Sequence, residues 1–163
     1  MKQNGLKRAA QADRTAAASQ PRSHTILYAI AAMVAVAGLA DATYLAVSHL
    51  TGQFVACGGS AQCSEVLSSK YAAIAGVPLA MVGAAGYFAA FSLATLAAFG
   101  YSRVRKALVL VISAMFLGTL WLLYLQAFVL HAYCTYCLLS AACTFVLAGL
   151  LLAIPPRKNT AVA

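Results

Sequence analysis

Four long runs of apolar residues constrain the fold of this chain more than any other feature of its sequence. They cover residues 25–48, 76–100, 107–129 and 135–154, and each matches the roughly 20 residues that a helix needs to cross a bilayer. Only 9% of the 163 residues are charged, whereas a soluble domain carries about 25%. The sequence therefore predicts an all-α membrane protein, a bundle of four transmembrane helices.

The basic residues predict how this bundle is oriented. Ten of the eleven Lys and Arg residues, all except Lys70, form three groups: Lys2, Lys7, Arg8, Arg14 and Arg22; Arg103, Arg105 and Lys106; and Arg157 and Lys158. If every apolar run crosses the membrane, all three groups lie on one face, and positive loops stay in the cytoplasm. We expect an inner (plasma) membrane protein with both termini cytoplasmic and residues 49–75 and 129–134 outside. This pattern also argues against nucleic-acid binding, despite the net charge of +8.

The segments outside the apolar runs define the domain organisation. We predict a disordered basic tail at 1–24, a membrane domain at 25–154 and a short cytoplasmic tail at 155–163. Residues 66–76 are expected to form a short helix that covers the exoplasmic side of the bundle. A cleaved signal peptide at 1–42 stays open as an alternative, because "ADA" at 40–42 resembles a cleavage site.

Four of the five cysteines fall on the predicted exoplasmic face, in two pairs. Cys57 and Cys63 flank the pliable segment "GGSAQ", and Cys134 and Cys137 form a Cys-x-x-Cys motif where the fourth run begins. Residues three apart share one face of a helix, and a helix start lowers the pKa of a thiol. Two such pairs suit a relay that moves electrons by disulfide exchange in an oxidising compartment such as the bacterial periplasm.

Other interpretations of these residues remain open at this point. Cys57 and Cys63 could form a permanent structural disulfide in a plain structural subunit. The Cys-x-x-Cys pair could bind zinc with His49 and His131, or serve a membrane metal-ion carrier that uses soft ligands. Cys143, inside the fourth run, is expected to be a packing thiol.

Three stretches resemble the vitamin K epoxide reductase family, in its bacterial disulfide-forming branch. They are "GLADATYL" (38–45), "CSEVLSSKYAAIAGVPLAMVG" (63–83) and "FVLHAYCTYCLLS" (128–140). The similarity runs from about residue 27 to residue 153. A loop cysteine pair followed by a later Cys-x-x-Cys is specific to this family, whereas the similar DsbB type carries its Cys-x-x-Cys first.

The resemblance implies an enzyme that oxidises thiols with a quinone, either ubiquinone or menaquinone. Cys134 and Cys137 match the active-site pair, with Cys137 nearer the quinone ring. Cys57 and Cys63 match the loop pair that carries electrons from a protein partner to Cys134. Ser69 matches a serine that hydrogen-bonds a quinone oxygen.

The resemblance also bears on the substrate and the partner. Animal members have a tyrosine where this chain has Ala141, which favours a respiratory quinone over vitamin K epoxide. Many bacterial relatives carry a fused thioredoxin-like domain, but this chain ends at Ala163. We therefore expect a separate periplasmic DsbA-like thioredoxin-fold protein as the partner, with membrane lipid around the bundle.

Several polar and aromatic residues of the runs have both a functional and a structural interpretation. Asp41 is the only acid in any run, and intramembrane carboxylates are costly, so we count it with Ser69 as cofactor-binding; it could instead lock helices together. His131 could shuttle protons or lie in solvent. Trp121, Tyr124 and Tyr133 could line the quinone ring or anchor the interface.

Overall fold

The computed structural model describes residues 22–52, 73–74, 77–99, 101 and 104–154. Its elements are helices α2 (Arg22–Thr51), α4 (Leu79–Ala98), α5 (Val104–Tyr124) and α6 (Thr135–Ala153), a π-helical turn η1 (Leu125–Leu130), and strands β1 (Ala73–Ile74) and β2 (Val77–Pro78). Among the described residues, four segments are long and apolar enough to span a membrane: His24–Thr51, Leu79–Ala98, Val104–Leu130 and Thr135–Ala153. The predicted four-helix membrane fold is confirmed.

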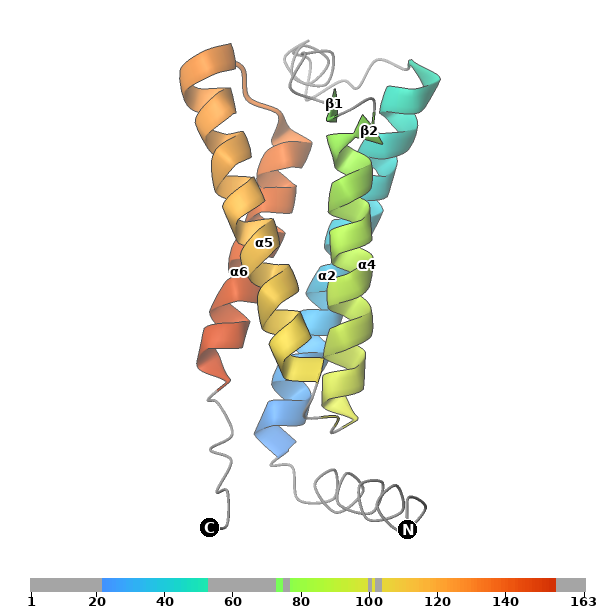
Figure 1. Cartoon of the computed structure of the whole chain (residues 1–163), viewed down its shortest axis with the longest axis vertical. Coiled ribbons are helices and arrows are strands. Elements are labelled where there is room, and N and C mark those ends of the chain that lie inside the picture. Colours follow the sequence, from blue (N-terminus) through green and yellow to red (C-terminus); the bar gives the residue numbers. More distant parts are fainter. Residues whose placement is uncertain (1–21, 53–72, 75–76, 100, 102–103, 155–163) are drawn as a thin grey trace, which may run out of the picture.

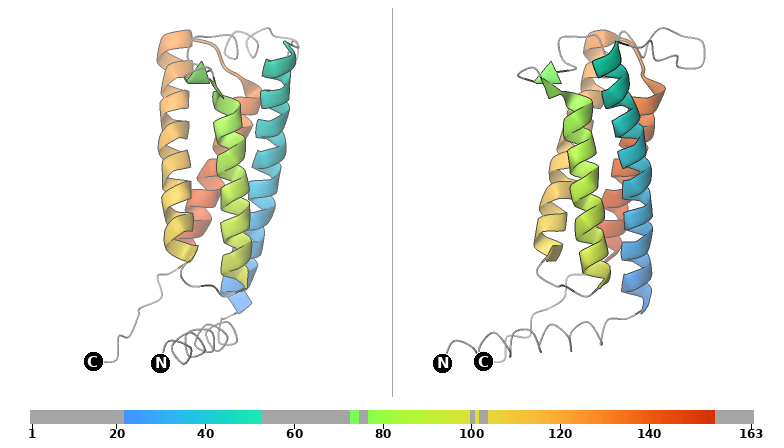
Figure 2. Two further views of the ribbon diagram at one scale, coloured as in Figure 1. Left: turned by 45° about the vertical axis from the view of Figure 1, so that its right-hand side comes forward. Right: turned by 90° about the vertical axis from the view of Figure 1, so that its right-hand side faces the viewer.

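The four helices run alternately up and down and form one bundle (Figure 1). Helix α2 packs against α4 and α6, and α5 packs against the same two helices, so each helix has two neighbours in a ring. Figure 2 shows from two further sides that β1 and β2 lie at the end where α2 finishes and α4 begins. We call this end, which also holds η1 and residues 131–134, the cysteine end. It carries the candidate site.

Local backbone chemistry determines where the helices stop at the cysteine end. Gly52 adopts a left-handed conformation with φ +65° directly after α2, as glycine commonly does at helix ends. At the other side of the same end, η1 stops at His131, whose φ of 50° is also left-handed. Residues 131–134 then run back into the bundle, so α6 starts below the top of α5 (Figure 1).

The predicted helix over residues 66–76 is wrong at its carboxyl end. Ala73 and Ile74 form β1, which pairs antiparallel with β2 through Ala73↔Pro78 and Ile74↔Val77. A proline disfavours helical geometry in the residue before it, and Pro78 itself is extended, with φ −57° and ψ 130°. The rest of that segment lies outside the described residues.

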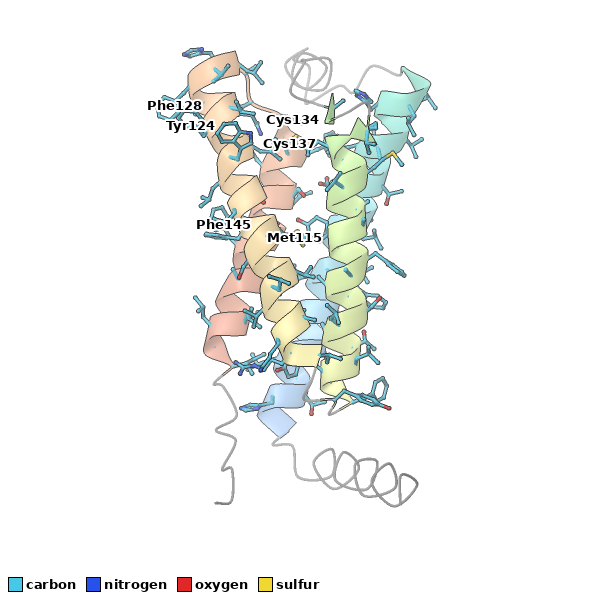
Figure 3. The ribbon with its side chains drawn as sticks, viewed as in Figure 1. Met115, Tyr124, Phe128, Cys134, Cys137 and Phe145 are labelled. Carbon is cyan, nitrogen blue, oxygen red and sulfur yellow. The ribbon has the colours of Figure 1, made fainter. Side chains whose placement is uncertain are left out.

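Small residues let the helices approach closely, as expected for packing in lipid. The buried core holds Ala31, Ala35, Ala90 and Ala94, whereas many large apolar side chains point outward. A Cβ on Gly86 would meet Met115 of α5 at 3.2 Å, and Figure 3 shows Met115 directed toward α4. The larger apolar residues on the outside are the surface that a bilayer would cover.

Candidate functional site

Cys134 and Cys137 lie together at the start of α6. Cys134 is the N-cap residue, with φ −94° and ψ 116°, and its side chain accepts a hydrogen bond from the Cys137 backbone N–H over 3.4 Å. Neither thiol forms a disulfide with another described residue. The side chain of Cys134 is buried and that of Cys137 is partly buried, and Figure 3 shows the pair on the side of α6 that faces the interior of the bundle.

The surroundings of Cys134 favour its thiolate form. A hydrogen bond from the Cys137 side chain, together with the backbone N–H groups of Cys137 and Tyr136, lowers the pKa of Cys134 to about 7, against the opposing effect of burial. Because the thiolate is the nucleophile in disulfide exchange, Cys134 is activated for attack on a neighbouring sulfur.

Gln126 holds the start of α6 in place. Its side-chain oxygen accepts a hydrogen bond of 3.1 Å from the Cys134 backbone N–H, and only 2% of Gln126 is exposed. Gln126 was not among the residues singled out from the sequence. A signal was present, because a lone amide within "LWLLYLQAFVL" must find a partner in an apolar span. Irregular π-turns such as η1 are also frequent at functional sites.

A cavity of about 130 Å³ opens beside Cys137. All four helices contribute to its wall, which is mostly apolar, including Ala42, Leu45, Gly83, Leu122, Leu123 and Ala141. The polar side chains at the wall belong to Cys137, Ser140, Gln126, Thr119 and His49. A void of this size is comparable to engineered protein cavities that take up a single benzene ring. An apolar wall with a few polar groups suits a quinone ring with its carbonyl oxygens.

Behind this cavity lies a cluster of three hydroxyl groups. The Tyr87 hydroxyl of α4 donates to the Ser140 carbonyl oxygen over 2.6 Å and lies 3.0 Å from Ser140 Oγ and 2.9 Å from Thr144 Oγ1. Gly38 of α2 makes room for the Tyr87 ring, because a Cβ there would overlap the ring. Gly38 was not among the residues singled out from the sequence.

Asp41 lies in the same interior, with 9% of its surface exposed. Within the described part of the chain, its Oδ2 atom has no hydrogen-bond partner. The carboxyl group interacts electrostatically with the sulfur atoms of Cys134 and Cys137 and with the Tyr87 hydroxyl. Asp41 does not line the cavity, whereas its neighbour Ala42 does.

The remaining residues singled out from the sequence fall in different places. Cys57, Cys63 and Ser69 lie outside the described residues. His49 lines the cavity, whereas His131 is exposed. In the part of the chain that the structure describes, no three His, Cys, Asp or Glu side chains gather as metal ligands would. Cys143 packs against the main core.

The three aromatic residues singled out from the sequence lie on the outside of the bundle and not at the cavity wall. Trp121 is 59% exposed, Tyr124 51% and Tyr133 52%, and none of them lines the cavity. Trp121 stacks on Tyr124 at 6.1 Å between ring centroids, and Tyr124 stacks on Phe128 at 5.2 Å. Figure 3 shows Tyr124 at the end of α5 and Phe128 in η1 on the outer side of the bundle. This placement fits interfacial anchors and not a ring-binding wall.

Comparison with known protein families gives one match over this fold. Residues 29–152 match the model of the vitamin K epoxide reductase family. The matched range includes most of all four helices, the cavity wall and the Cys-x-x-Cys pair, and it agrees with the resemblance drawn from residues 27–153.

Proposed function

Because this chain belongs to the vitamin K epoxide reductase family, we propose that it is a quinone-dependent thiol–disulfide oxidoreductase of the inner membrane. Family membership makes it a multi-pass membrane oxidoreductase; the electron path and the partner are our proposal. Electrons enter from a reduced DsbA-like thioredoxin-fold protein in the periplasm and leave to ubiquinone or menaquinone. The reaction supports disulfide formation in exported proteins.

The different positions of the Cys134 and Cys137 thiols support this proposal. Cys137 forms part of the cavity wall, while the activated Cys134 is buried, does not belong to that wall and caps the helix. One sulfur is thus placed to meet a lipid-soluble acceptor, and its neighbour is placed to exchange with another sulfur. An arrangement of this kind passes electrons from an aqueous donor into the bilayer.

The proposed relay proceeds through sulfur exchange. A partner thiolate attacks the Cys57–Cys63 disulfide at Cys57, and the released Cys63 attacks the Cys134–Cys137 disulfide at Cys134. Cys57 then attacks Cys63, which restores the loop disulfide and leaves Cys134 and Cys137 reduced. The pair reforms its own disulfide as two electrons leave through Cys137. Each exchange breaks one S–S bond and forms another.

The cavity residues fit the proposed quinone. The leucines around it would pack on the ring, and Ser140 and Gln126 carry hydrogen-bonding groups suited to its carbonyl oxygens. Ser69, outside the described residues, is proposed as a further donor from the loop. When bound, the quinone supplies the capacity to take up two electrons and two protons. Ala141 lies at the cavity wall, so the position where animal members have a tyrosine carries no hydroxyl, which supports a respiratory quinone.

Replacing Cys137 by Ala tests the proposal directly. Reduced DsbA-like protein and the full-length chain in lipid are mixed with a ubiquinone or menaquinone analogue, and the loss of quinone absorbance is followed. The wild type should reduce the quinone, the Cys137→Ala protein should not, and the matched control Cys143→Ala should resemble the wild type, because Cys143 packs in the core.

Two results would contradict the proposal. Unchanged quinone reduction by Cys137→Ala would show that the electrons do not leave through this sulfur. A wild-type protein that reduces no quinone but is purified with bound transition metal would favour the metal-ion carrier instead.

A further inference from the structure

Asp41 is a buried ionisable group that the sulfur relay does not use. Nine-tenths of its surface is buried, and its Oδ2 atom has no hydrogen-bond partner among the residues that the structure describes. A lone carboxylate in the interior of a membrane bundle is costly, so such a group persists as a neutral acid or in exchange with a nearby proton site. We therefore expect this carboxyl oxygen to gain and lose a hydrogen-bond partner during the reaction.

The position of Asp41 along α2 places it between two features of the site. Four residues after it, Leu45 packs in one cluster with Cys134 and Cys137. Three residues before it, Gly38 abuts the Tyr87 ring. Residues three and four apart share one helical face, so Asp41 lies between the level of the thiols and the level of Tyr87.

The hydroxyl cluster continues from Tyr87 to the cavity. Tyr87 bridges α4 to α6 through Ser140 and Thr144, and Ser140 lines the cavity one helical turn from Cys137. The described titratable groups that interact electrostatically with Asp41 are Tyr87, Tyr136 and the thiols of Cys134, Cys137 and Cys143. Hydroxyl groups both donate and accept, so a chain of them can pass a proton along.

We propose that Asp41, Tyr87 and Ser140 form an internal proton relay that delivers a proton to the acceptor in the cavity while the Cys134–Cys137 pair is oxidised. The inference rests on the proposed function and adds the source of the protons. A mostly apolar wall offers few groups that hold water in place as a proton donor, whereas Ser140 connects the cavity wall to the Tyr87 hydroxyl.

The step balances in electrons and protons. Before it, Cys134 is a thiolate, Cys137 is a thiol and Asp41 is a neutral acid. The Cys134 thiolate attacks the Cys137 sulfur, the S–S bond forms, and two electrons pass to the quinone in the cavity. Asp41 gives one proton through Tyr87 and Ser140 and is protonated again by the proton of Cys137. The second proton that quinol formation needs comes from water at the cysteine end.

The first test follows a single turnover. Wild-type, Asp41→Asn and Tyr87→Phe proteins in lipid are reduced, freed of reductant and mixed with a quinone analogue in light and heavy water. Loss of a positioned proton donor should slow quinol formation about 10²-fold in either variant. Asp41→Glu should recover part of the rate. The matched control Thr144→Val removes a hydroxyl of the cluster that does not line the cavity, and it should retain most of the rate.

A second readout requires no quinone and no turnover. In the infrared spectrum of the quinone-free protein, a buried carboxylic acid gives a carbonyl band that shifts in heavy water. The wild type should show this band, Asp41→Asn should lack it, and Tyr87→Phe should move it, because the proposed relay connects the phenol to the acid. The alkylation rate of Cys134 serves as the check on structure, because a misfolded variant would not be alkylated at the wild-type rate.

The outcomes separate the two claims. Single-turnover rates equal to the wild type in both Asp41→Asn and Tyr87→Phe, with normal alkylation of Cys134, would overturn the relay and leave the proposed function intact. Absence of the carboxylic acid band from the wild type would also overturn it. If the wild type itself passes no electrons to quinone, the proposed function fails, and the relay fails with it.

Discussion

The backbone N–H of Cys134 donates a 3.1 Å hydrogen bond to the side-chain oxygen of Gln126, eight residues earlier in the chain. This contact joins the π-helical end of the third span to the first turn of the fourth. It positions the sulfur of Cys134 as the N-cap of α6, where that sulfur receives its own hydrogen bonds. The contact therefore links the irregular backbone at the cysteine end to the chemistry of the thiol pair.

Replacing Gln126 by Leu should destabilise the fold and slow the exchange at Cys134. The variant keeps the bulk of the side chain but leaves the buried Cys134 N–H without an acceptor, which costs about 1–3 kcal/mol in the free energy of unfolding. Thermal unfolding in detergent measures this loss. Gln126→Glu, which keeps an acceptor oxygen, is the matched control and should lie closer to the wild type; equal stability of the wild type and the leucine variant would refute the role assigned to this contact.

The rate at which Cys134 is alkylated should depend on pH with a midpoint near its pKa of about 7. The pKa is lowered first by the hydrogen bond from the Cys137 side chain, so Cys137→Ala should move the midpoint upward, toward that of an ordinary thiol. Iodoacetamide labelling of the reduced protein, read by mass spectrometry, gives both profiles. Coincident profiles would contradict the assigned cause.

The lowered pKa of Cys134 also makes the free energy of unfolding depend on pH. A thiol whose pKa is lower in the folded state than in the unfolded state stabilises the fold above its unfolded pKa, and that contribution disappears as the pH falls through the folded value. Unfolding of the reduced protein should thus become easier as the pH drops from about 9 to about 7. In Cys134→Ser this part of the pH dependence should be smaller, and an unchanged slope in the variant would argue against a thiolate.

Replacing Gly38 by Ala should weaken the packing of α2 on α4. The new Cβ would overlap the Tyr87 ring, and overpacking of this kind typically costs 1–3 kcal/mol. It should also disturb the Tyr87 hydroxyl contacts with Ser140 and Thr144. Gly118→Ala is the matched control, because a Cβ on Gly118 has no neighbour within 4 Å and the change favours helix. Equal unfolding temperatures for the two variants would show that the Gly38 contact is not restrictive.

Trp121 is expected to face lipid and not the quinone cavity. It is the chain's one tryptophan, and its side chain is 59% exposed on the outer side of the bundle. In vesicles that contain brominated lipids its fluorescence should be strongly quenched, whereas water-soluble acrylamide should quench it weakly. The reverse order of quenching would place this face of α5 against water or protein.

Much of this architecture follows from the sequence alone. A span of about 20 apolar residues must be helical in lipid, because every backbone N–H and C=O has to be paired within the segment. That requirement applies to each apolar run separately, so the four helices and the place of Cys134 and Cys137 at the start of the last one could be predicted without knowing how the helices meet. Trp121 and Tyr124 could likewise be predicted as interfacial anchors, because that prediction depends on a single apolar run and not on how the helices meet.

Only the tertiary structure decided which side chains meet across helices. Four features of the site depend on how residues from different helices are placed against one another. They are the close approach of Gly38 to Tyr87, the Gln126 contact to Cys134, the cavity beside Cys137, and the Asp41 oxygen that has no partner among the described residues. Almost every side chain in these runs is apolar, so hydrophobic pattern cannot distinguish a face that packs on another helix from a face that touches lipid. The spans are determined by local backbone chemistry, whereas the site arises from contacts between distant segments.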